Sequence, residues 1–178
     1  SIMVVGILIL VLAVAGIGIH IISKYIPSKE QMNLTEYYGQ PAEGEMVLVL
    51  GTDIMEERAL KSGDQIYLPQ DIVSTYLNQR YYWDSGNQQI LYATPSSLEK
   101  FPASEAGDGE VWVRDGKVYL SLSLVQKYTD LDFYEYQEPA RVVIRHEFTG
   151  VNVATVKKDT SIRYRGGIKS PVLTEVKK

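Results

Sequence analysis

The chain has 178 residues, of which 45% are hydrophobic and none is cysteine. This length allows one domain of ordinary size with an appendage. The lack of cysteine excludes disulfides, thiolate metal sites and cysteine nucleophiles. Residues 1–140 contain nine Lys/Arg and nineteen Asp/Glu, a net charge of −10, whereas residues 141–178 contain nine and three, a net charge of +6. The acidic main part excludes a nucleic-acid interface there, because such an interface needs a basic stripe.

The first predicted element is an almost unbroken apolar run from Ile2 to Ile22. About 20 apolar residues are enough to cross a bilayer as a helix. A cleaved signal peptide is the alternative, because Ala13-Val14-Ala15 resembles a small-residue cleavage site. However, the run continues beyond this site and exceeds the roughly 7–15 apolar residues of a signal peptide. We therefore expect an uncleaved transmembrane anchor over residues 1–23.

Residues 24–45 are expected to form a juxtamembrane linker. Pro27, Gly39, Pro41 and Gly44 interrupt regular structure in this segment. Within it, the stretch MNLTEYY at 32–38 has the composition of a short helix. The following domain is expected to span residues 46–148.

The first elements of this domain are predicted by strand and turn signals. Residues 46–50 (MVLVL) have the composition of a buried strand, and a second extended run covers residues 55–60. Residues 65–92 then combine a strand, a helical pattern over residues 72–77, and two strands joined by Ser85-Gly86-Asn87. This is a strand–helix–hairpin unit.

The same unit recurs at residues 117–144. A constant offset of 52 pairs Tyr67 with Tyr119, Tyr76 with Tyr128 and Tyr82 with Tyr134. Such an offset across strand, helix and hairpin positions indicates a duplication, because each copy must bury the same faces. Residues 94–109 are expected to be a loop between the copies, followed by a strand at 111–113. The fold class is predicted to be α+β.

Residues 150–178 contain short β runs at 151–156, 161–164 and 172–176. Because so few residues cannot close an independent barrel, two alternatives remain. Either these strands pack on the preceding domain, or they begin a further domain that continues beyond Lys178.

The duplicated unit resembles the copper amine oxidase N-terminal-like domain of cell-surface proteins from Gram-positive bacteria. The pattern of that domain is a Tyr-x-Pro strand end, a short helix, a Trp-Asp hairpin and an isoleucine-rich return strand. The first copy carries it at Tyr67-Leu68-Pro69, Tyr76-Leu77, Trp83-Asp84 and Ile90. The second copy departs from it, with Ser121 in place of the proline and Glu135-Tyr136 in place of Trp-Asp.

The C-terminal segment at 156–178 (VKKDTSIRYRGGIKSPVLTEVKK) resembles the first half of a bacterial Src-homology-3-like domain of the cell-wall type. The order of anchor, amine-oxidase-like domain and wall-type barrel is similar to the front end of membrane-attached family 18 glycoside hydrolases. This resemblance implies a catalytic barrel further along the parent protein.

Copper is the first ligand that the resemblance suggests, but the residues do not favour a metal site. Outside the apolar run the chain has one histidine, His146, and no cysteine. An imidazole- or thiolate-rich copper site therefore cannot be assembled within one chain. We expect His146 to be an ordinary strand-end residue, and we predict no metal and no cofactor.

Glycosidase chemistry requires two carboxylates at a set separation. The densest acidic cluster consists of Asp130, Asp132, Glu135 and Glu138. The family 18 catalytic strand begins Asp-Gly and spaces its acids by two, whereas here no glycine follows Asp130 and the gap from Asp132 to Glu135 is three. A solvated acidic face is the favoured interpretation. With no Gly-x-Ser-x-Gly motif for a serine nucleophile either, the chain is predicted not to be an enzyme by itself.

The thirteen tyrosines are the remaining functional candidates. In an alternating strand, Tyr81 and Trp83 share one face while Tyr82 points to the other. The clusters Tyr81-Tyr82-Trp83 and Phe133-Tyr134-Tyr136 are expected to contribute mainly to the core. Tyr82 and its counterpart Tyr134 are the predicted exposed contacts for a glycan or a partner.

The sequence thus predicts a non-catalytic, membrane-anchored stalk that positions a cell-surface protein at the cell wall. Its expected location is the bacterial cell membrane, with a single span and an extracytoplasmic soluble part. Its expected partners are the membrane, through Ile2–Ile22, and peptidoglycan or another wall glycan. The alternative is a glycan- or protein-binding module with an exposed aromatic face.

Overall fold

A computed structural model of the chain describes residues 2–146 and 154–178. The described residues fall into two compact units, one covering residues 34–146 and the other combining residues 2–33 with 154–178. The expected α+β composition, with an apolar N-terminal helix and a mostly β body, is confirmed.

The body of the first unit, which we call the sheet unit, is one ten-stranded sheet. Its strands follow the order β4-β5-β6-β7-β8-β3-β2-β1-β10-β9. Their bounds are β1 Glu45–Leu50, β2 Asp53–Ser62, β3 Gln65–Pro69, β4 Tyr81–Asp84, β5 Gln89–Ala93, β6 Leu98–Ser104, β7 Val111–Arg114, β8 Lys117–Ser121, β9 Leu131–Gln137 and β10 Ala140–His146.

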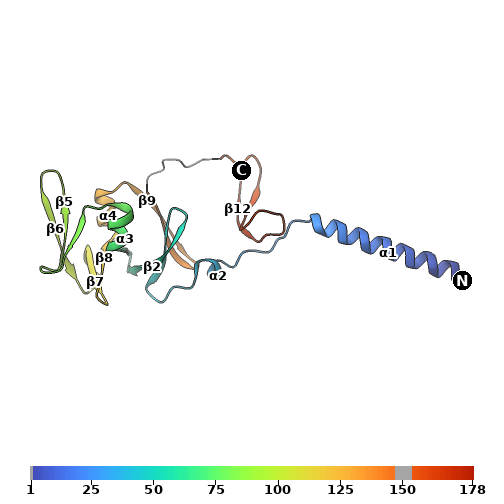
Figure 1. Ribbon diagram of the computed structural model, residues 1–178, viewed down its shortest axis with the longest axis horizontal. Coiled ribbons are helices and arrows are strands. Elements are labelled where there is room, and N and C mark those ends of the chain that lie inside the picture. The colour runs from blue at the N-terminus through green and yellow to red at the C-terminus, as the bar shows by residue number, and fades with distance from the viewer. Residues whose placement is uncertain (1, 147–153) are drawn as a thin grey trace. The chain divides into compact units, whose positions relative to one another are not determined.

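Three short helical segments accompany the sheet. They are α2 (Leu34–Tyr38), α3 (Gln70–Ile72), which continues into the π-helical turn η1 (Val73–Leu77), and α4 (Leu122–Tyr128). The segment α3 lies against β8, while α4 lies against both β3 and β8 at the centre of the sheet (Figure 1). At the start of α4, the Ser121 hydroxyl accepts a hydrogen bond from the Leu124 amide at 3.2 Å, which satisfies one of the free N–H groups of the helix.

Two sequence predictions about these elements were wrong. Residues 94–109 were expected to form a loop, but β6 occupies 98–104 because it pairs antiparallel with β5 and buries Phe101 in the core. A single buried apolar residue among polar neighbours gives no alternating pattern. The pattern of the predicted helix at 72–77 puts Ile72, Val73 and Tyr76 on one face. Ile72 and Val73 are buried but Tyr76 is exposed, because a π-helical turn changes the angular spacing of the side chains.

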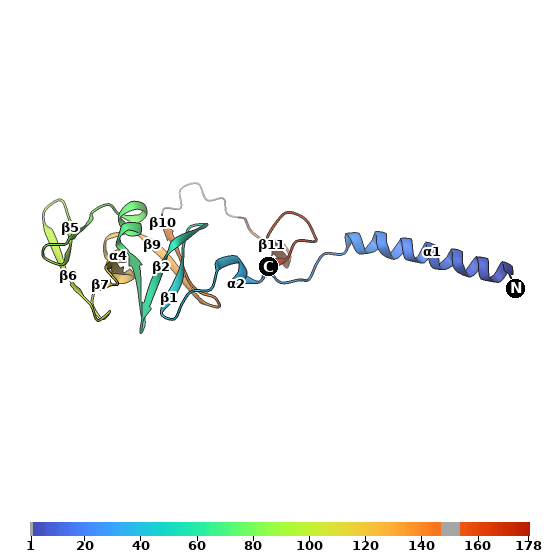
Figure 2. The same cartoon turned by 60° about the horizontal axis from the view of Figure 1, so that its bottom comes forward.

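The two predicted copies contain the same kinds of element in the same order. Residues 65–93 contain β3, a short helical segment, β4 and β5; residues 117–146 contain β8, α4, β9 and β10. In neither copy does the hairpin pair with that copy's own first strand. The β4–β5 hairpin joins the sheet through the pairing of β5 with β6, and the β9–β10 hairpin joins it through the pairing of β10 with β1. As a result, β4 and β9 form the two edges, and Figure 2 shows β5 and β6 at one end of the unit and β9 and β10 at the other.

The second unit begins with α1, which spans Ile2–Tyr25. Its segment Val4–Tyr25 is long and apolar enough to cross a membrane. The described apolar side chains of this segment are exposed around the helix rather than along one stripe. This confirms the expectation of an N-terminal helix suited to a bilayer, by length and composition.

The same unit contains two strands in its described part, β11 (Thr160–Arg163) and β12 (Val172–Val176), which pair antiparallel. The segment after α1 runs alongside β12, because the Met32 amide donates to the Val172 carbonyl at 2.8 Å and the Val172 amide donates to the Glu30 carbonyl at 2.8 Å. Part of the predicted linker, residues 28–32, is thus hydrogen-bonded to β12 and to the segment before it. Of the strand expected at 151–156, residues 154–156 are not in a strand, and 151–153 lie outside the described residues.

Candidate functional site

The two tyrosines predicted to be exposed are both exposed, but the fold does not bring them together. Tyr82 on β4 has an exposed fraction of 67%, and Tyr134 on β9 has one of 44%. Because β4 and β9 are opposite edges of the ten-stranded sheet, these residues cannot share one contact surface on a single chain. Each must be considered with its own neighbours.

The aromatic cluster around Tyr82 is mostly core, as expected. Tyr81 is buried and Trp83 is partly buried against the core. Tyr81 packs against both Tyr92 of β5 and Tyr128 of α4, with ring centroids 4.7 and 6.4 Å away. This leaves Tyr82 as an isolated exposed ring at the β4 edge.

The second cluster behaves differently, and its assignment to the core was wrong. Phe133 and Tyr136 have exposed fractions of 38% and 43%, beside the 44% of Tyr134. The reason is the position of β9: as an edge strand it is exposed on both faces after Leu131. The sequence shows the alternation but not which strand lies at an edge.

Tyr134 and Tyr136 lie on the same face of β9, because alternate residues of a strand point the same way. An arginine guanidinium from the neighbouring strand β10 lies over each ring. The Arg145 guanidinium lies 4.9 Å from the Tyr134 ring centroid, and the Arg141 guanidinium lies 4.1 Å from that of Tyr136. We call these four residues the aromatic–guanidinium strip.

Arg141 fixes one end of this strip. Its guanidinium is sandwiched between Tyr136 and Tyr38 of α2, which lies 4.7 Å away. Its Nη1 donates to the carbonyls of Glu138 and Pro139 at 3.0 and 3.2 Å, and the side chain has an exposed fraction of only 8%. Stacking and hydrogen bonding together hold the Tyr136 ring in place.

The chemistry of the strip is that of a shallow contact surface. It offers two tyrosine rings, two phenol hydroxyls and the exposed guanidinium of Arg145. Such groups can stack on the apolar face of a sugar and bond its hydroxyls. Sequence reasoning found Tyr134 but missed Tyr136, Arg141 and Arg145. The spacing of Tyr134 and Tyr136 by two was the available signal.

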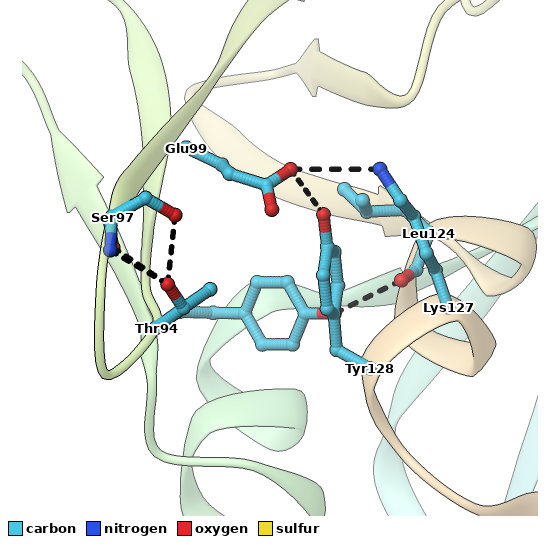
Figure 3. A network of polar contacts seen from close by, with 7 residues as sticks. Thr94, Ser97, Glu99, Leu124, Lys127 and Tyr128 are labelled. Atoms are coloured by element: carbon cyan, nitrogen blue, oxygen red, sulfur yellow. Dashed lines mark hydrogen bonds and ion pairs between the residues drawn. The ribbon is translucent and has the colours of Figure 1, made fainter.

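A second polar cluster joins β6 to α4 (Figure 3). The Tyr128 hydroxyl donates to the Glu99 carboxylate, and the Lys127 ammonium lies 3.5 Å from the same carboxylate. Burial, followed by the hydrogen bond to Glu99, raises the pKa of Tyr128. The hydrogen bond with Tyr128, ahead of the charge of Glu99, raises the pKa of Lys127.

These pKa directions favour a structural role for the cluster. Nucleophilic or basic catalysis by lysine or tyrosine requires a lowered pKa, whereas here both groups retain their protons more firmly. The ring of Tyr128 also stacks on Tyr92 with centroids 4.1 Å apart. The cluster therefore fastens α4 over the aromatic core.

The acidic cluster predicted to be a solvated face is exposed throughout. Asp132 and Glu135 point to opposite faces of β9, so they do not converge on one reacting atom. The hydrogen bond from Lys61 lowers the pKa of Glu135, which suits a paired carboxylate and not a general acid. The other two acids, Asp130 and Glu138, flank β9 on either side.

His146 ends β10, and its Nδ1 lies 2.9 Å from the Asp130 carbonyl oxygen. Within residues 2–146 and 154–178, no group of three or more His, Cys, Asp or Glu side chains could hold a metal ion. Comparison with known proteins adds no family assignment: no family model, curated protein or solved structure matches this chain.

Proposed function

We propose that this chain is a non-catalytic, membrane-anchored positioning module that holds a bacterial cell-surface protein near the cell wall. In this proposal α1 is the single-pass anchor and the sheet unit lies outside the cytoplasm. The two strand–helix–hairpin copies arise from a duplication. The parent protein is a family 18 glycoside hydrolase, and the strands β11 and β12 begin a Src-homology-3-like domain.

The observation that carries the proposal is the apolar helical segment Val4–Tyr25, which the rest of the chain does not bury. An apolar helix that is uncovered on all sides needs an apolar solvent, and a bilayer supplies one. This supports membrane anchoring of the chain, and anchoring would restrict the sheet unit to the region next to the membrane.

The construction of the sheet unit supports a positioning role. Ten strands form one hydrogen-bonded sheet, and the core extends through it from Met46 to Ile144. The Glu99–Tyr128 bond and the Tyr81–Leu124 bond tie α4 to the sheet at two further points. A unit joined in this way resists bending, which a spacer requires.

The absence of cysteine makes the proposed orientation directly testable. A single Ser96→Cys substitution places a thiol in the exposed turn between β5 and β6. In intact bacterial cells, a membrane-impermeant maleimide should label this cysteine as fully as in lysed cells. A Ser1→Cys chain, labelled only after lysis, is the matched control. Labelling of Ser96→Cys only after lysis would place the sheet unit inside and refute the proposal.

A second candidate function is weak glycan binding through the aromatic–guanidinium strip. The specific observation in its favour is that Tyr134 and Tyr136 expose two adjacent rings on one face of β9, each backed by an arginine. Adjacent rings suit a chain of sugars, since successive residues can stack along them.

Co-sedimentation with purified peptidoglycan tests this second function. The full chain is held in a polyoxyethylene detergent, because detergents with sugar headgroups would compete. Retention that persists at 0.5 M salt and is lost in Tyr134→Ala/Tyr136→Ala would establish stacking, because stacking is screened far less than ionic contact. Tyr82→Ala, at the opposite edge, is the control and should bind normally. Retention that disappears with salt alone would indicate ionic contact instead.

A further inference from the structure

The face of β9 opposite the strip borders a pocket that the proposed functions do not use. This pocket has a volume of about 350 Å³, within the roughly 300–1,000 Å³ range of small-molecule sites. The turn between β2 and β3, the start of α4 and the strand β9 surround it. Its lining residues are Asp64, Gln65, Ile66, Leu122, Ser123, Gln126, Phe133 and Glu135.

One wall of the pocket is the aromatic ring of Phe133, which is not buried in the hydrophobic core. Phe133 has an exposed fraction of 38%, whereas its counterpart at the 52-residue offset, Tyr81, is buried and donates a hydrogen bond to the Leu124 carbonyl at 2.9 Å. Phe133 has no hydroxyl that could fix it to α4 in the same way. The ring therefore remains available as a flat apolar surface beside the pocket.

Polar side chains from two other elements line the pocket together with this ring. Gln65 begins β3, while Ser123 and Gln126 belong to α4. Gln126 donates to the Leu131 carbonyl at 3.4 Å, which orients its amide and leaves the amide oxygen as an acceptor. Among the described residues, Asp64 and Gln65 use no side-chain atom in a hydrogen bond or ion pair.

The charge balance of the pocket selects the class of ligand. Glu135 is already paired with Lys61, so Asp64 is the one uncompensated carboxylate among the lining residues. An anionic ligand would face a net negative wall. A neutral ligand rich in hydroxyl groups matches this lining. The side-chain amides can both donate to it and accept from it, whereas the Asp64 carboxylate can accept from it, as can the Ser123 hydroxyl, which itself donates to the Ser121 hydroxyl at 3.1 Å.

Two further features narrow this class to an acetylated amino sugar. One face of a pyranose ring presents C–H groups, whose positive edges suit the negative face of Phe133. The aliphatic side chains of Ile66 and Leu122 provide an apolar part of the lining, which suits the methyl group of an acetamide. The amides of Gln65 and Gln126 can pair with the acetamide N–H and C=O groups.

We propose that this pocket binds an N-acetylated sugar residue, with Phe133 as the stacking surface. The site is separate from the aromatic–guanidinium strip, because Phe133 and Tyr134 point to opposite faces of β9. It depends neither on the anchored orientation nor on the second candidate function.

The test uses the full chain in a polyoxyethylene detergent and the tetrasaccharide of N-acetylglucosamine at millimolar concentration. Saturation-transfer NMR reports on the sugar, and backbone amide shifts report on the protein. We expect transfer to the acetyl methyl group and shift changes at Gln65, Ser123 and Gln126. Phe133→Leu keeps an apolar side chain but removes the ring, and it should weaken binding by about tenfold.

A second variant and a matched control separate the possible outcomes. Gln65→Ala, at an exposed position, should also weaken binding without affecting the fold. Tyr134→Ala/Tyr136→Ala should bind as the unmodified chain does. The proposal is overturned if no transfer is seen at 10 mM sugar, or if Phe133→Leu and Gln65→Ala bind normally. Loss of binding only in the strip variant would also overturn it, and would assign glycan contact to the strip instead.

Discussion

Leu68 and Leu120 lie directly opposite each other in the pairing of β3 with β8, and both are fully buried. They are also 52 residues apart, the offset that relates the two predicted copies. The flanking pairs are reciprocal: Tyr67 faces Ser121, and Pro69 faces Tyr119. Two copies related by a local twofold axis would give this register, which supports the proposed duplication.

The buried hydroxyl of Tyr81 is expected to contribute measurably to stability. It donates to the Leu124 carbonyl at 2.9 Å and so joins β4 to α4. Tyr81→Phe removes this buried hydrogen bond, so the free energy of unfolding should fall by about 0.5–1.5 kcal/mol. Urea unfolding followed by tryptophan fluorescence measures this. Tyr82→Phe, at an exposed position, is the control; equal stabilities of the two variants would contradict the prediction.

Gly107 is expected to tolerate no side chain. Its φ is +69°, and a Cβ at this position would lie 2.8 Å from Cε2 of Trp112. Its carbonyl also accepts a hydrogen bond from the Tyr67 hydroxyl at 3.0 Å. Gly107→Ala should therefore lower the free energy of unfolding by about 1–3 kcal/mol and shift the emission of Trp112.

Gly86 provides the matched control for this substitution. It lies in the exposed turn between β4 and β5, where an added Cβ would have ordinary contact with Asp84 at 3.5 Å. Gly86→Ala should change the unfolding free energy by less than about 0.5 kcal/mol. A Gly107→Ala chain as stable as Gly86→Ala would show that the loop before β7 repacks freely.

The ion pair between Lys61 and Glu135 should give a pH-dependent difference in stability. Lys61 lowers the pKa of Glu135, so the pair stabilises the fold above the unfolded carboxyl pKa of about 4.3. That stabilisation is lost as the pH falls through the folded pKa. Lys61→Met should lower the unfolding free energy at pH 7 by about 0.2–1 kcal/mol.

Urea titrations of the unmodified and Lys61→Met chains at pH 7, 5 and 3 check this sign. The difference between them should be largest at pH 7 and shrink at pH 3. Lys100→Met removes an exposed lysine on β6 and should leave stability unchanged at every pH. A difference that persists undiminished at pH 3 would assign the effect to the lysine stem rather than to its charge.

Membrane attachment should depend on the apolar surface of α1. The double substitution Ile9→Arg/Leu12→Arg places two charges in the candidate span. Each charge disfavours insertion by about 2.5–3.5 kcal/mol, so the protein should move from the membrane to the alkaline carbonate extract. Val11→Leu should remain in the membrane. Sequencing of the mature N-terminus adds a second check, because cleavage after Ala15 would leave a chain that begins at Gly16.

Much of the sheet unit could be predicted from local sequence because its strands are short alternating runs between turn residues. The strands β1, β5 and β8 lie close to their predicted positions. The pairing partners could not be predicted, since β1 pairs in parallel with β10, which lies far along the chain. Alternation identifies a strand and its two faces but does not identify its neighbours.

The same limit explains the outcome for the candidate site. Tyr82 was identified as exposed because it lies between Tyr81 and Trp83, which share the opposite face of the strand, and Tyr134 was identified as its counterpart at the 52-residue offset. Their separation at opposite edges follows from sheet order alone. Likewise, Phe133 looks like a core residue in sequence, and only its place on the edge strand exposes it.

The parallel pairing of β1 with β10 has a consequence for the order in which the protein can fold as it is synthesised. Val47 lies beside Arg141 in this pairing, so one side of β1 stays unpaired until almost the whole sheet unit has left the ribosome. Contacts between such distant segments form slowly, because a long loop must close first. A nascent chain that stops before Ala140 would keep an open apolar strand at its start, ready to pair with another nascent chain. Completion of this sheet therefore waits for the arrival of β10, whereas the pairings from β2 to β8 involve only earlier residues.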